Sequence, residues 1–436
     1  MTVKNIFVAC GFTWNNKGDA ALLMATAQAL RKSLPEVTLS FASFTPVLDT
    51  ENYHEKVVRM PLDPSGRPSK FIHSLGKFSP IVLHGVLSLV LSVFRIWLLL
   101  QKVFPEKLSY GLLGRIAPTA KEIMNADLVV ALPGGYLQAT VRTDDFWLFH
   151  WLTLSMAKAA GKPVVIYAQS IGPFEGSHKS WAINLLKKID VISVREDFSL
   201  DRLKEYGLPM NRIVLVPDAA FGLEDDGRGI QEMESLAESL KYLPQPWVGV
   251  SVREHNFPGK TNPEVWMDKY ITEIARAADL LIELSHGTVF FVPQCIRTGG
   301  LDLEVSREVL KKMSRPECAR IIDEDISPLA LQVLYARFEM LIGTRMHANI
   351  LTMCAGTPVV AIAYERKTNG IMKMLGLEEN VINIEDVEGA LLPLVERVFS
   401  TRESIKQHLA QSVPKIRSQA LATPKILIAK LQEFTL

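Results

Sequence analysis

The sequence has few cysteines and almost no net charge. Its four cysteines, Cys10, Cys295, Cys318 and Cys354, lie far apart without a CxxC pair, which indicates neither a zinc knuckle nor a disulfide framework. Lys and Arg number 48 against 47 Asp and Glu, so the net charge of +1 gives no general attraction to nucleic acid, and any anion site must be local. Because the N-terminus lacks a secretory signal pattern and the cysteine usage fits a reducing compartment, we expect a cytoplasmic protein.

Apolar strands alternate with helical stretches along the chain. The composition is globular, at 48% hydrophobic and 22% charged residues, and 436 residues exceed what one hydrophobic core usually serves. Short apolar runs predict strands at Asn5–Cys10, Asp127–Leu132, Pro163–Ala168, Val191–Val194, Arg212–Val216, Trp247–Val252, Thr288–Val292, Phe338–Ile342 and Val359–Ala363. This alternation predicts an α/β fold with parallel sheets covered by helices on both faces.

A break between two runs of strands predicts a domain boundary. The helical stretch Glu224–Leu243 is polar and ends at Pro244-Gln245-Pro246. We therefore predict two Rossmann-like domains, residues 1–240 and 241–400, that face each other across a cleft. A C-terminal helical segment, residues 401–436, is expected to pack back on the domains.

One apolar segment stands out from this pattern, in an insert at about residues 71–107. Ile81–Leu100 is long enough to span a bilayer, but Arg95 at that depth disfavours a span. Lysines flank the segment on both sides, at Lys70, Lys77, Lys102 and Lys107. Basic flanks favour a helix or helical hairpin that lies on an anionic membrane surface. A buried helix or an oligomer-forming helix remains the alternative.

Most of the unusual polar residues follow the C-terminal ends of predicted strands, where open α/β sheets bind ligands. In the first loop, Gly18 allows close backbone approach and Asp19 is expected to cap a helix that starts at Ala20. This loop is neither a G-x-G-x-x-G nor a Walker A loop. Pro133-Gly134-Gly135 and Gly172-Pro173 are predicted turns whose backbone N–H groups could face an anion. For the first loop the alternative is a helix cap and a tight turn without a ligand, and each of the two later turns is weak evidence when taken alone.

The strongest cluster is Gly343-Thr344-Arg345-Met346-His347 at a predicted strand-to-helix turn. A helix N-terminus favours anions, an arginine fork suits carboxylate or phosphate, and a histidine exchanges protons near neutral pH. Lys367 follows the next strand. Arg195 and Arg253 also follow strands, but each precedes a glutamate, so an ordinary ion pair is the alternative for both. Cations at one sheet edge predict a small dianion or trianion as ligand.

Several motifs together resemble the polysaccharide pyruvyltransferases, in particular the branch associated with colanic-acid-type exopolysaccharides. They occur in the family's order and cover most of the chain from residue 5 to about residue 380. The motifs are NKGDAALL (16–23), LPGGYL (132–137), AQSIGPF (168–174), SVRE (193–196), PD (217–218), VPQ (292–294), GTRMHANI (343–350) and YERKTNGIMKMLGL (364–377). The long insert departs from typical members.

The resemblance implies a fold of the glycosyltransferase-B type and transfer of a pyruvyl group from phosphoenolpyruvate to a hexose of a polysaccharide or lipid-linked precursor. Phosphoenolpyruvate is then a co-substrate, and no cofactor or metal is expected. His347 is the expected general acid, with Asp19 as an acceptor-side group. Donor-binding positions are expected at Arg195, Arg345, Lys367 and Arg253, and acceptor or loop positions at Asn16, Gly134, Gly135, Gln169 and Gln294.

Two other functions remain open from the sequence. A nucleotide-sugar-dependent glycosyltransferase of the same fold would use a similar site with a nucleobase and two phosphates on its donor. A non-catalytic, membrane-bound scaffold of a polysaccharide assembly complex would explain Ile81–Leu100, but it leaves the Arg345–His347 cluster without a role. The acidic run Asp323-Glu324-Asp325 is interpreted as a charged surface turn rather than a metal site.

Overall fold

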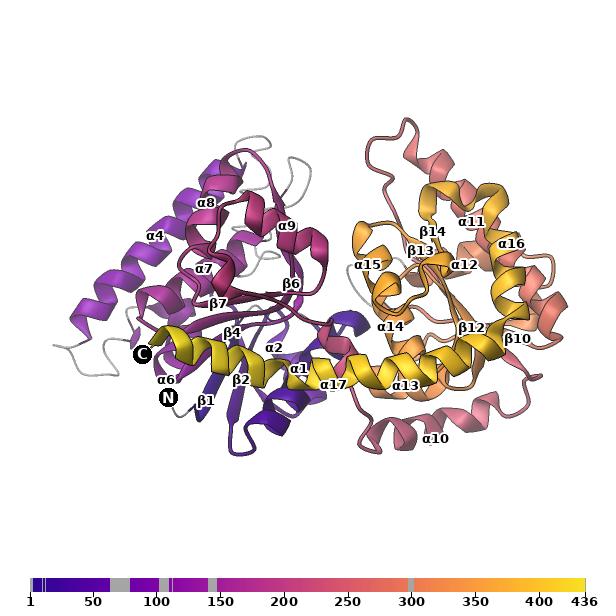
Figure 1. Cartoon of the computed structure of the whole chain (residues 1–436), viewed down its shortest axis with the longest axis horizontal. Helices are drawn as coiled ribbons and strands as arrows, with labels where there is room; N and C mark the ends of the chain where they lie inside the picture. Colours follow the sequence, from indigo (N-terminus) through magenta and orange to yellow (C-terminus); the bar gives the residue numbers. More distant parts are fainter. Residues whose placement is uncertain are drawn as a thin grey trace. The chain divides into compact units, whose positions relative to one another are not determined.

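The computed structural model describes residues 3–9, 11, 13–62, 79–101, 110–111, 113–139, 147–296 and 302–435. These residues form two compact units, which are shown in Figure 1. The first unit contains residues 1–14, 22–219 and 420–436, and the second contains residues 15–21 and 220–419. Cys10 and the flanking lysines Lys70, Lys77, Lys102 and Lys107 lie outside the described residues.

The first unit is built on an 8-stranded sheet in the order β3-β2-β1-β4-β6-β7-β8, with β5 paired to β6. All of its described pairings are parallel. Its central strands are mostly apolar because helices cover both faces of a parallel sheet, and all four residues of β4 are buried. The strands are β1 (Asn5–Ala9), β2 (Thr38–Ser43), β3 (Lys56–Arg59), β4 (Leu128–Ala131), β5 (Gly134–Ala139), β6 (Val164–Phe174), β7 (Val191–Val194) and β8 (Ile213–Leu215).

The helices of the first unit pack their apolar sides against this sheet or against one another. Figure 1 shows α4 along the outside of the unit beside α7, and residues of both helices belong to one buried core. The helices are α1 (Lys17–Ser33), α2 (Pro46–Tyr53), α4 (Ser79–Leu100), α6 (Ala117–Asn125), α7 (Trp147–Ala159), α8 (Ser177–Leu186) and α9 (Asp197–Glu205).

The second unit contains a 6-stranded sheet in the order β11-β10-β9-β12-β13-β14, again with parallel pairings. Its strands are β9 (Trp247–Ser251), β10 (Thr288–Phe291), β11 (Ala319–Ile321), β12 (Phe338–Gly343), β13 (Val359–Ala363) and β14 (Val381–Asn383). Its helices are α10 (Arg228–Leu240), α11 (Pro263–Ser285), α12 (Asp302–Lys312), α13 (Pro328–Tyr335), α14 (Met346–Cys354), α15 (Arg366–Met374) and α16 (Val387–Ser400), with most of α17 (Arg402–Thr435).

The strand order of each sheet reverses direction once, next to its first strand. In the second unit the chain moves outward from β9 through β10 to β11, and then returns to the other side of β9 at β12. The connections after β9 and β12 therefore leave in opposite directions. Doubly wound folds bind their ligands at the carboxyl edge of the sheet beside such a switch point.

The α/β class and the nine predicted strands are confirmed, with shifted ends. The short strands β2, β3, β11 and β14 were not predicted. The units divide at Ala219/Ala220, earlier than the expected boundary near Leu240, because α10 packs against α13 of the second unit. The helical segment predicted at 401–436 is α17, whose last residues, from Ala420, group with the first unit.

The predicted turns in the first unit need correction. Gly134 and Gly135 begin β5, and Gly172-Pro173 lies inside β6, because β5 and β6 continue their pairing beyond the edge where β4 ends. Gly134 is the register partner of Gln169 in this pairing. These two segments are strands, and they do not form the anion-binding turns expected from the sequence.

Candidate active site

Four strands of the second unit each deliver a polar side chain to the same edge of the sheet. Arg253 follows β9, Gln294 follows β10, Arg345 follows β12, and Lys367 lies in the first turn of α15 after β13. Because these strands are parallel neighbours, their carboxyl ends lie together. The second unit therefore gathers three cations at the edge that includes its switch point.

Arg345 is oriented by a buried carboxylate. Its Nε donates to Asp302 Oδ2 at 2.9 Å and its Nη2 donates to Asp302 Oδ1 at 2.5 Å, which is a bidentate pair. Asp302 is completely buried at the start of α12, whereas the Arg345 side chain is 18% exposed. Burial disfavours the charge on Arg345, but the attraction of Asp302 outweighs it and the pKa of Arg345 is raised. Arg345 is thus a fixed cation with one side accessible.

The turn between β12 and α14 is held by contacts that specify its residues. A Cβ at Gly343 would overlap the carboxamide oxygen of Asn349, and Asn349 Nδ2 donates to the Gly343 carbonyl at 3.0 Å. Thr344 is buried, and its hydroxyl lies 2.7 Å from the Tyr270 hydroxyl. These contacts fix the backbone from which Arg345 and His347 project.

The segment Asn15–Ala21, which includes the first turn of α1, belongs to the second unit. The backbone N–H of Lys17 donates to the Gln294 carbonyl at 2.9 Å, and Asn16 forms an antiparallel bridge with Cys295. Helix α1 begins at Lys17, so Asp19 lies within its first turn and is not the cap expected before Ala20. The cap is Asn16, whose Oδ1 accepts from the Gly18 N–H at 3.0 Å.

His347 packs directly against Gly18. A Cβ at position 18 would overlap the imidazole ring, so only glycine fits this approach. Asn16 Nδ2 also donates to Asp19 Oδ2 at 2.7 Å, which orients the carboxylate one residue beyond Gly18. His347, the predicted general acid, therefore contacts the residue that immediately precedes Asp19, the predicted acceptor-side carboxylate.

Buried interactions anchor the same segment. Lys17 is 1% exposed and forms an ion pair with Asp325. The acidic run that was interpreted as a surface turn therefore contributes one carboxylate to this anchor. Among the described residues, no three His, Cys, Asp or Glu side chains are grouped as metal ligands.

Cys295 lies where the charges of this edge converge. Burial raises the pKa of its thiol to about 12; Arg345 and Arg253 lower it, and Asp302 and Asp19 raise it. Four charged groups from four separate segments thus act on one buried sulfur atom. Gln294, beside it, is 1% exposed, and its Nε2 donates to the Tyr335 hydroxyl at 2.9 Å.

Arg253 and Lys367 share an aromatic neighbour. The Arg253 guanidinium lies 3.9 Å from the centre of the Tyr364 ring, and the Lys367 ammonium lies 5.5 Å from it. Lys367 also forms an ion pair with Glu365 at 2.7 Å. Arg253 donates to the backbone carbonyl of Glu254, not to its carboxylate. The aromatic face holds both cations beside the Arg345 turn.

Arg195 belongs to the first unit and has different surroundings. Its Nη1 donates to Asp218 at 2.6 Å, its Nε donates to Ser170 at 2.9 Å, and Glu196 lies 3.5 Å away. The arginine side chain is 1% exposed and Asp218 is completely buried. These contacts favour the ion-pair interpretation of Arg195. Gln169 of the same unit is also buried, and its Nε2 donates to the Leu132 carbonyl.

The second unit thus contains seven of the eleven residues expected from the sequence to act in the site or its loops: Asn16, Asp19, Arg253, Gln294, Arg345, His347 and Lys367. Gly134, Gly135, Gln169 and Arg195 belong to the first unit. Sequence reasoning missed Asp302, Cys295 and Tyr364. An aspartate at the start of a helical stretch, shortly after the VPQ motif, was the available signal for Asp302.

The fold defines a two-domain α/β protein of the glycosyltransferase-B type, and three cations lie at one sheet edge of its second unit. Residues 16–366 match the family described as polysaccharide pyruvyl transferase. The chain belongs to this family of transferases.

The chain is also similar in sequence to one known protein and in structure to several solved ones. The amylovoran biosynthesis protein AmsJ of Erwinia amylovora is 26% identical over 271 residues, which cover 60% of this chain and 64% of that protein. HepE of Anabaena in complex with UDP and glucose has a TM-score of 0.55 at 13% identity, with all of both chains covered. UDP-GlcNAc 2-epimerase of Neisseria meningitidis has a TM-score of 0.57 at 10% identity, over 99% of this chain and 100% of that one. At such identities the two structures show the fold alone.

Proposed function

We propose that this protein transfers a pyruvyl group from phosphoenolpyruvate to two hydroxyl groups of a hexose in a polysaccharide or a lipid-linked precursor, and releases phosphate. The observation that carries the proposal is the turn after β12. It presents Arg345, fixed by Asp302, two residues before His347, whose ring packs against Gly18. Family membership supports the reaction class.

The cations of the second unit suit a donor with a carboxylate and a phosphate. Arg345 has a planar fork held in one orientation, which matches the two oxygens of a carboxylate or phosphate. Lys367 and Arg253 both lie near the Tyr364 ring and supply further positive charge. We leave Arg195 out of the donor site because its guanidinium is already bonded to Asp218 and Ser170.

The proposed chemistry begins with proton transfer to carbon. His347 gives a proton to the methylene carbon of phosphoenolpyruvate, which becomes a methyl group and leaves the enol carbon electron-deficient. One sugar hydroxyl bonds to that carbon and loses its proton to a base. The bond from carbon to the phosphate oxygen then breaks, and inorganic phosphate leaves with the electron pair. A second hydroxyl bonds to the same carbon, loses its proton and closes the ketal. The atoms balance with phosphoenolpyruvate and the sugar alone.

Asp19 is the proposed base for an acceptor hydroxyl. Asn16 Nδ2 donates a hydrogen bond to one oxygen of this carboxylate at 2.7 Å. The charges of Asp19 and Arg345 both act on the pKa of the Cys295 thiol. A carboxylate oriented beside the donor cations can accept the proton that the first hydroxyl releases. Gln294 and Asn16 stand at the same edge as polar groups for the sugar.

We further propose that the protein works in the cytoplasm, with an acceptor presented at the cytoplasmic surface of the membrane. Support for this part comes from helix α4, which is long and apolar enough by composition to cross a bilayer between Val82 and Leu100. A surface location would bring the enzyme to a lipid-linked acceptor.

Ligand stabilisation tests the donor. A ligand that binds the folded but not the unfolded state raises the melting temperature, and the rise grows with the ratio of ligand concentration to Kd. We expect phosphoenolpyruvate to raise it, and we expect UDP-glucose and pyruvate at equal concentration to have no effect. A rise with UDP-glucose and none with phosphoenolpyruvate would replace the proposal with a nucleotide-sugar-dependent glycosyltransferase.

A further inference from the structure

Helix α4 exposes a continuous apolar stripe. Positions three and four residues apart fall on one side of a helix. The exposed residues Leu89 and Ile96 lie at the centre of this stripe, at 65% and 57% exposure. The whole stripe consists of Val82, Val86, Leu89, Val93, Ile96 and Leu100.

A second side of α4 is part of the core of the first unit. Leu87, Leu91 and Phe94 are buried there, and the helix packs along α7. A single membrane-spanning helix would be surrounded by lipid, whereas one face of α4 packs against the core of its own unit. The composition that fits a membrane span therefore belongs to a helix with one buried and one exposed apolar face.

A third side of α4 lines a pocket of about 360 Å³. Ser88, Ser92 and Arg95 contribute to it from α4 and are spaced to share one side of the helix. Facing residues come from α7 and from the end of α8, including Trp151, Trp181, Ser155 and Lys188. No aspartate or glutamate is among the described residues that line it.

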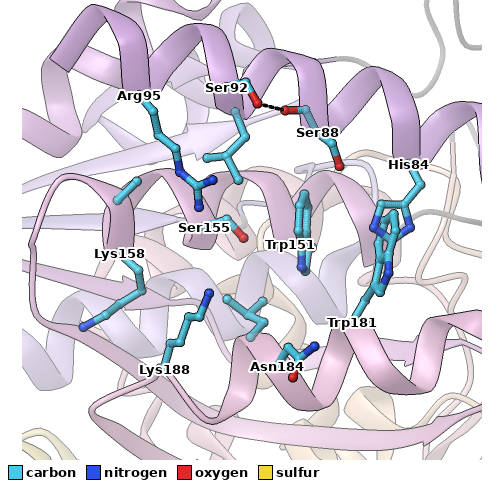
Figure 2. A pocket seen from close by; sticks show the side chains of 13 residues that line it. His84, Ser88, Ser92, Arg95, Trp151, Ser155, Lys158, Trp181, Asn184 and Lys188 are labelled. Atoms are coloured by element: carbon cyan, nitrogen blue, oxygen red, sulfur yellow. Dashed lines mark hydrogen bonds between the residues drawn. The ribbon is translucent and has the colours of Figure 1, made fainter. Parts of the chain in front are cut away.

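Two cations of the pocket extend into the same space. Figure 2 shows Arg95 reaching from α4 and Lys188 reaching from the end of α8 toward one another, beside Ser155. Lys158 points away from them, and its ammonium is bonded to Asp190 at 2.6 Å. Within the described part of the chain, neither Arg95 nor Lys188 has an acidic partner. An anion in this pocket would supply one.

We propose that α4 and this pocket dock the protein on an anionic phospholipid bilayer. The stripe enters the acyl boundary, and Arg95 and Lys188 bind the phosphate group of one lipid. The charge of the pocket and the apolar stripe occur on adjacent sides of one helix, which is the arrangement of a helix that lies in the plane of the interface. The inference does not rest on pyruvyl transfer, so the two can fail separately.

The side chains next to the stripe suit the headgroup level of a membrane when α4 lies with its stripe toward the acyl chains. When the stripe is buried in the acyl boundary, residues on a neighbouring side of the helix stand at the level of the headgroups. Trp151 and Trp181 both line the pocket. Tryptophan side chains favour that level because they have an apolar body and a polar N–H. The serines and cations beside them would then face phosphate oxygens.

Vesicle sedimentation of the full chain tests the proposal. We expect the protein to sediment with vesicles of phosphatidylcholine and phosphatidylglycerol, and much less with phosphatidylcholine alone. The paired change Arg95→Gln and Lys188→Gln should weaken partitioning into the anionic vesicles by roughly 25-fold, because each cation near an anionic surface contributes about five-fold. Lys187→Gln with Arg115→Gln is the matched control, since both residues are exposed and neither lines the pocket.

The stripe has its own pair of variants. Leu89→Gln with Ile96→Gln should abolish partitioning and leave the melting temperature unchanged, since both side chains are exposed. Ile230→Gln with Val265→Gln is the control, because these residues are exposed apolar side chains of the second unit. Phosphoenolpyruvate binding without vesicles should be the same in all four variants.

Three results would overturn the proposal. The wild-type protein could fail to sediment with anionic vesicles, or the Arg95 and Lys188 variant could partition like its control. Light scattering could instead show a dimer that Leu89→Gln with Ile96→Gln converts to a monomer, in which case a second copy covers the stripe. Inorganic phosphate that competes with vesicles for the wild type but not for the Arg95 and Lys188 variant would support the pocket as the phosphate site.

Discussion

Each unit of this protein places an arginine one or two residues after a parallel strand and pairs it with a buried aspartate, yet the two arginines differ in solvent exposure. Arg195 is 1% exposed, and Asp218, Ser170 and Glu196 surround it. Arg345 is 18% exposed and has one carboxylate partner, Asp302, which binds it along one edge of the guanidinium. The same motif thus serves internal packing in one unit and presents a cation in the other.

The residues that follow the two arginines also differ, because Glu196 contacts buried groups and His347 contacts the segment that carries Asp19. Glu196 turns back to the buried pair, where it accepts hydrogen bonds from Ser170 and Ser199. His347 instead packs on Gly18, in a segment that carries Asp19. An arginine after a strand is therefore weak evidence of a ligand site until its partners are known. The predictions below test this contrast.

The largest effect on turnover is expected from His347→Ala. If the imidazole protonates the donor, kcat should fall on the order of 10²–10⁴ while phosphoenolpyruvate affinity changes little. Phosphate release with a glycan acceptor measures kcat, and calorimetry measures the affinity. Normal turnover by His347→Ala would remove the general-acid assignment.

Arg195→Ala should instead affect stability. The change leaves the completely buried Asp218 without its charged partner, and the loss of one member of a buried pair typically costs about 3–5 kcal/mol. Urea unfolding of the variant measures this loss. Arg202→Ala is the control, because its partner Glu205 is on the surface at 3.9 Å and such a pair contributes little. An equally stable Arg195→Ala variant with weakened donor binding would return Arg195 to the donor site.

Arg345→Ala should weaken phosphoenolpyruvate binding by roughly 10- to 100-fold, as expected for loss of charged hydrogen bonds. Asp302→Asn should act in the same direction with a smaller effect, because Asp302 orients the guanidinium without facing the ligand. Both are measured by calorimetry on folded protein. A normal affinity in Asp302→Asn would show that the carboxylate does not position Arg345.

Gly18→Ala should reduce kcat by about 10-fold, because the added methyl group displaces the His347 ring from its place. Donor affinity should change less than in Arg345→Ala. Steady-state kinetics separate the two effects. An unaffected kcat would show that the contact between Gly18 and His347 is not needed for the reaction.

The smallest effect is expected from Lys367→Ala, a loss of about two- to five-fold in donor affinity, since Lys367 is already paired with Glu365. Lys373→Ala is the matched control on the same helix, α15, where it is exposed. A loss as large as that of Arg345→Ala would make Lys367 a principal donor ligand.

The strands and the strand-end residues of the second unit could be predicted because β9, β10, β12 and β13 are short, mostly apolar runs that are followed by charged or polar residues. The turn at Arg345 and His347 was found on the same grounds. Strand β5 was missed because Pro133, Gly134 and Gly135 favour a turn locally, whereas pairing with β6 determines the strand.

The partners of the site residues could not be predicted, because they come from distant parts of the sequence. Asp302 and Arg345 are 43 positions apart, and Lys17 and Asp325 are 308 positions apart. No local pattern specifies such contacts. For the same reason the sequence did not separate the buried Arg195 from the accessible Arg345, or place residues 15–21 in the second unit.

Calorimetric titration of phosphoenolpyruvate into the wild type, Arg345→Ala and Arg337→Ala tests the central claim most directly. Arg337 is an exposed arginine that immediately precedes β12, at the opposite end of the strand that Arg345 follows. Saturable binding by the wild type and Arg337→Ala, and its loss in folded Arg345→Ala, is the predicted result. Equal binding by all three proteins, or no binding by the folded wild type, would contradict the assignment of the donor site to the second unit.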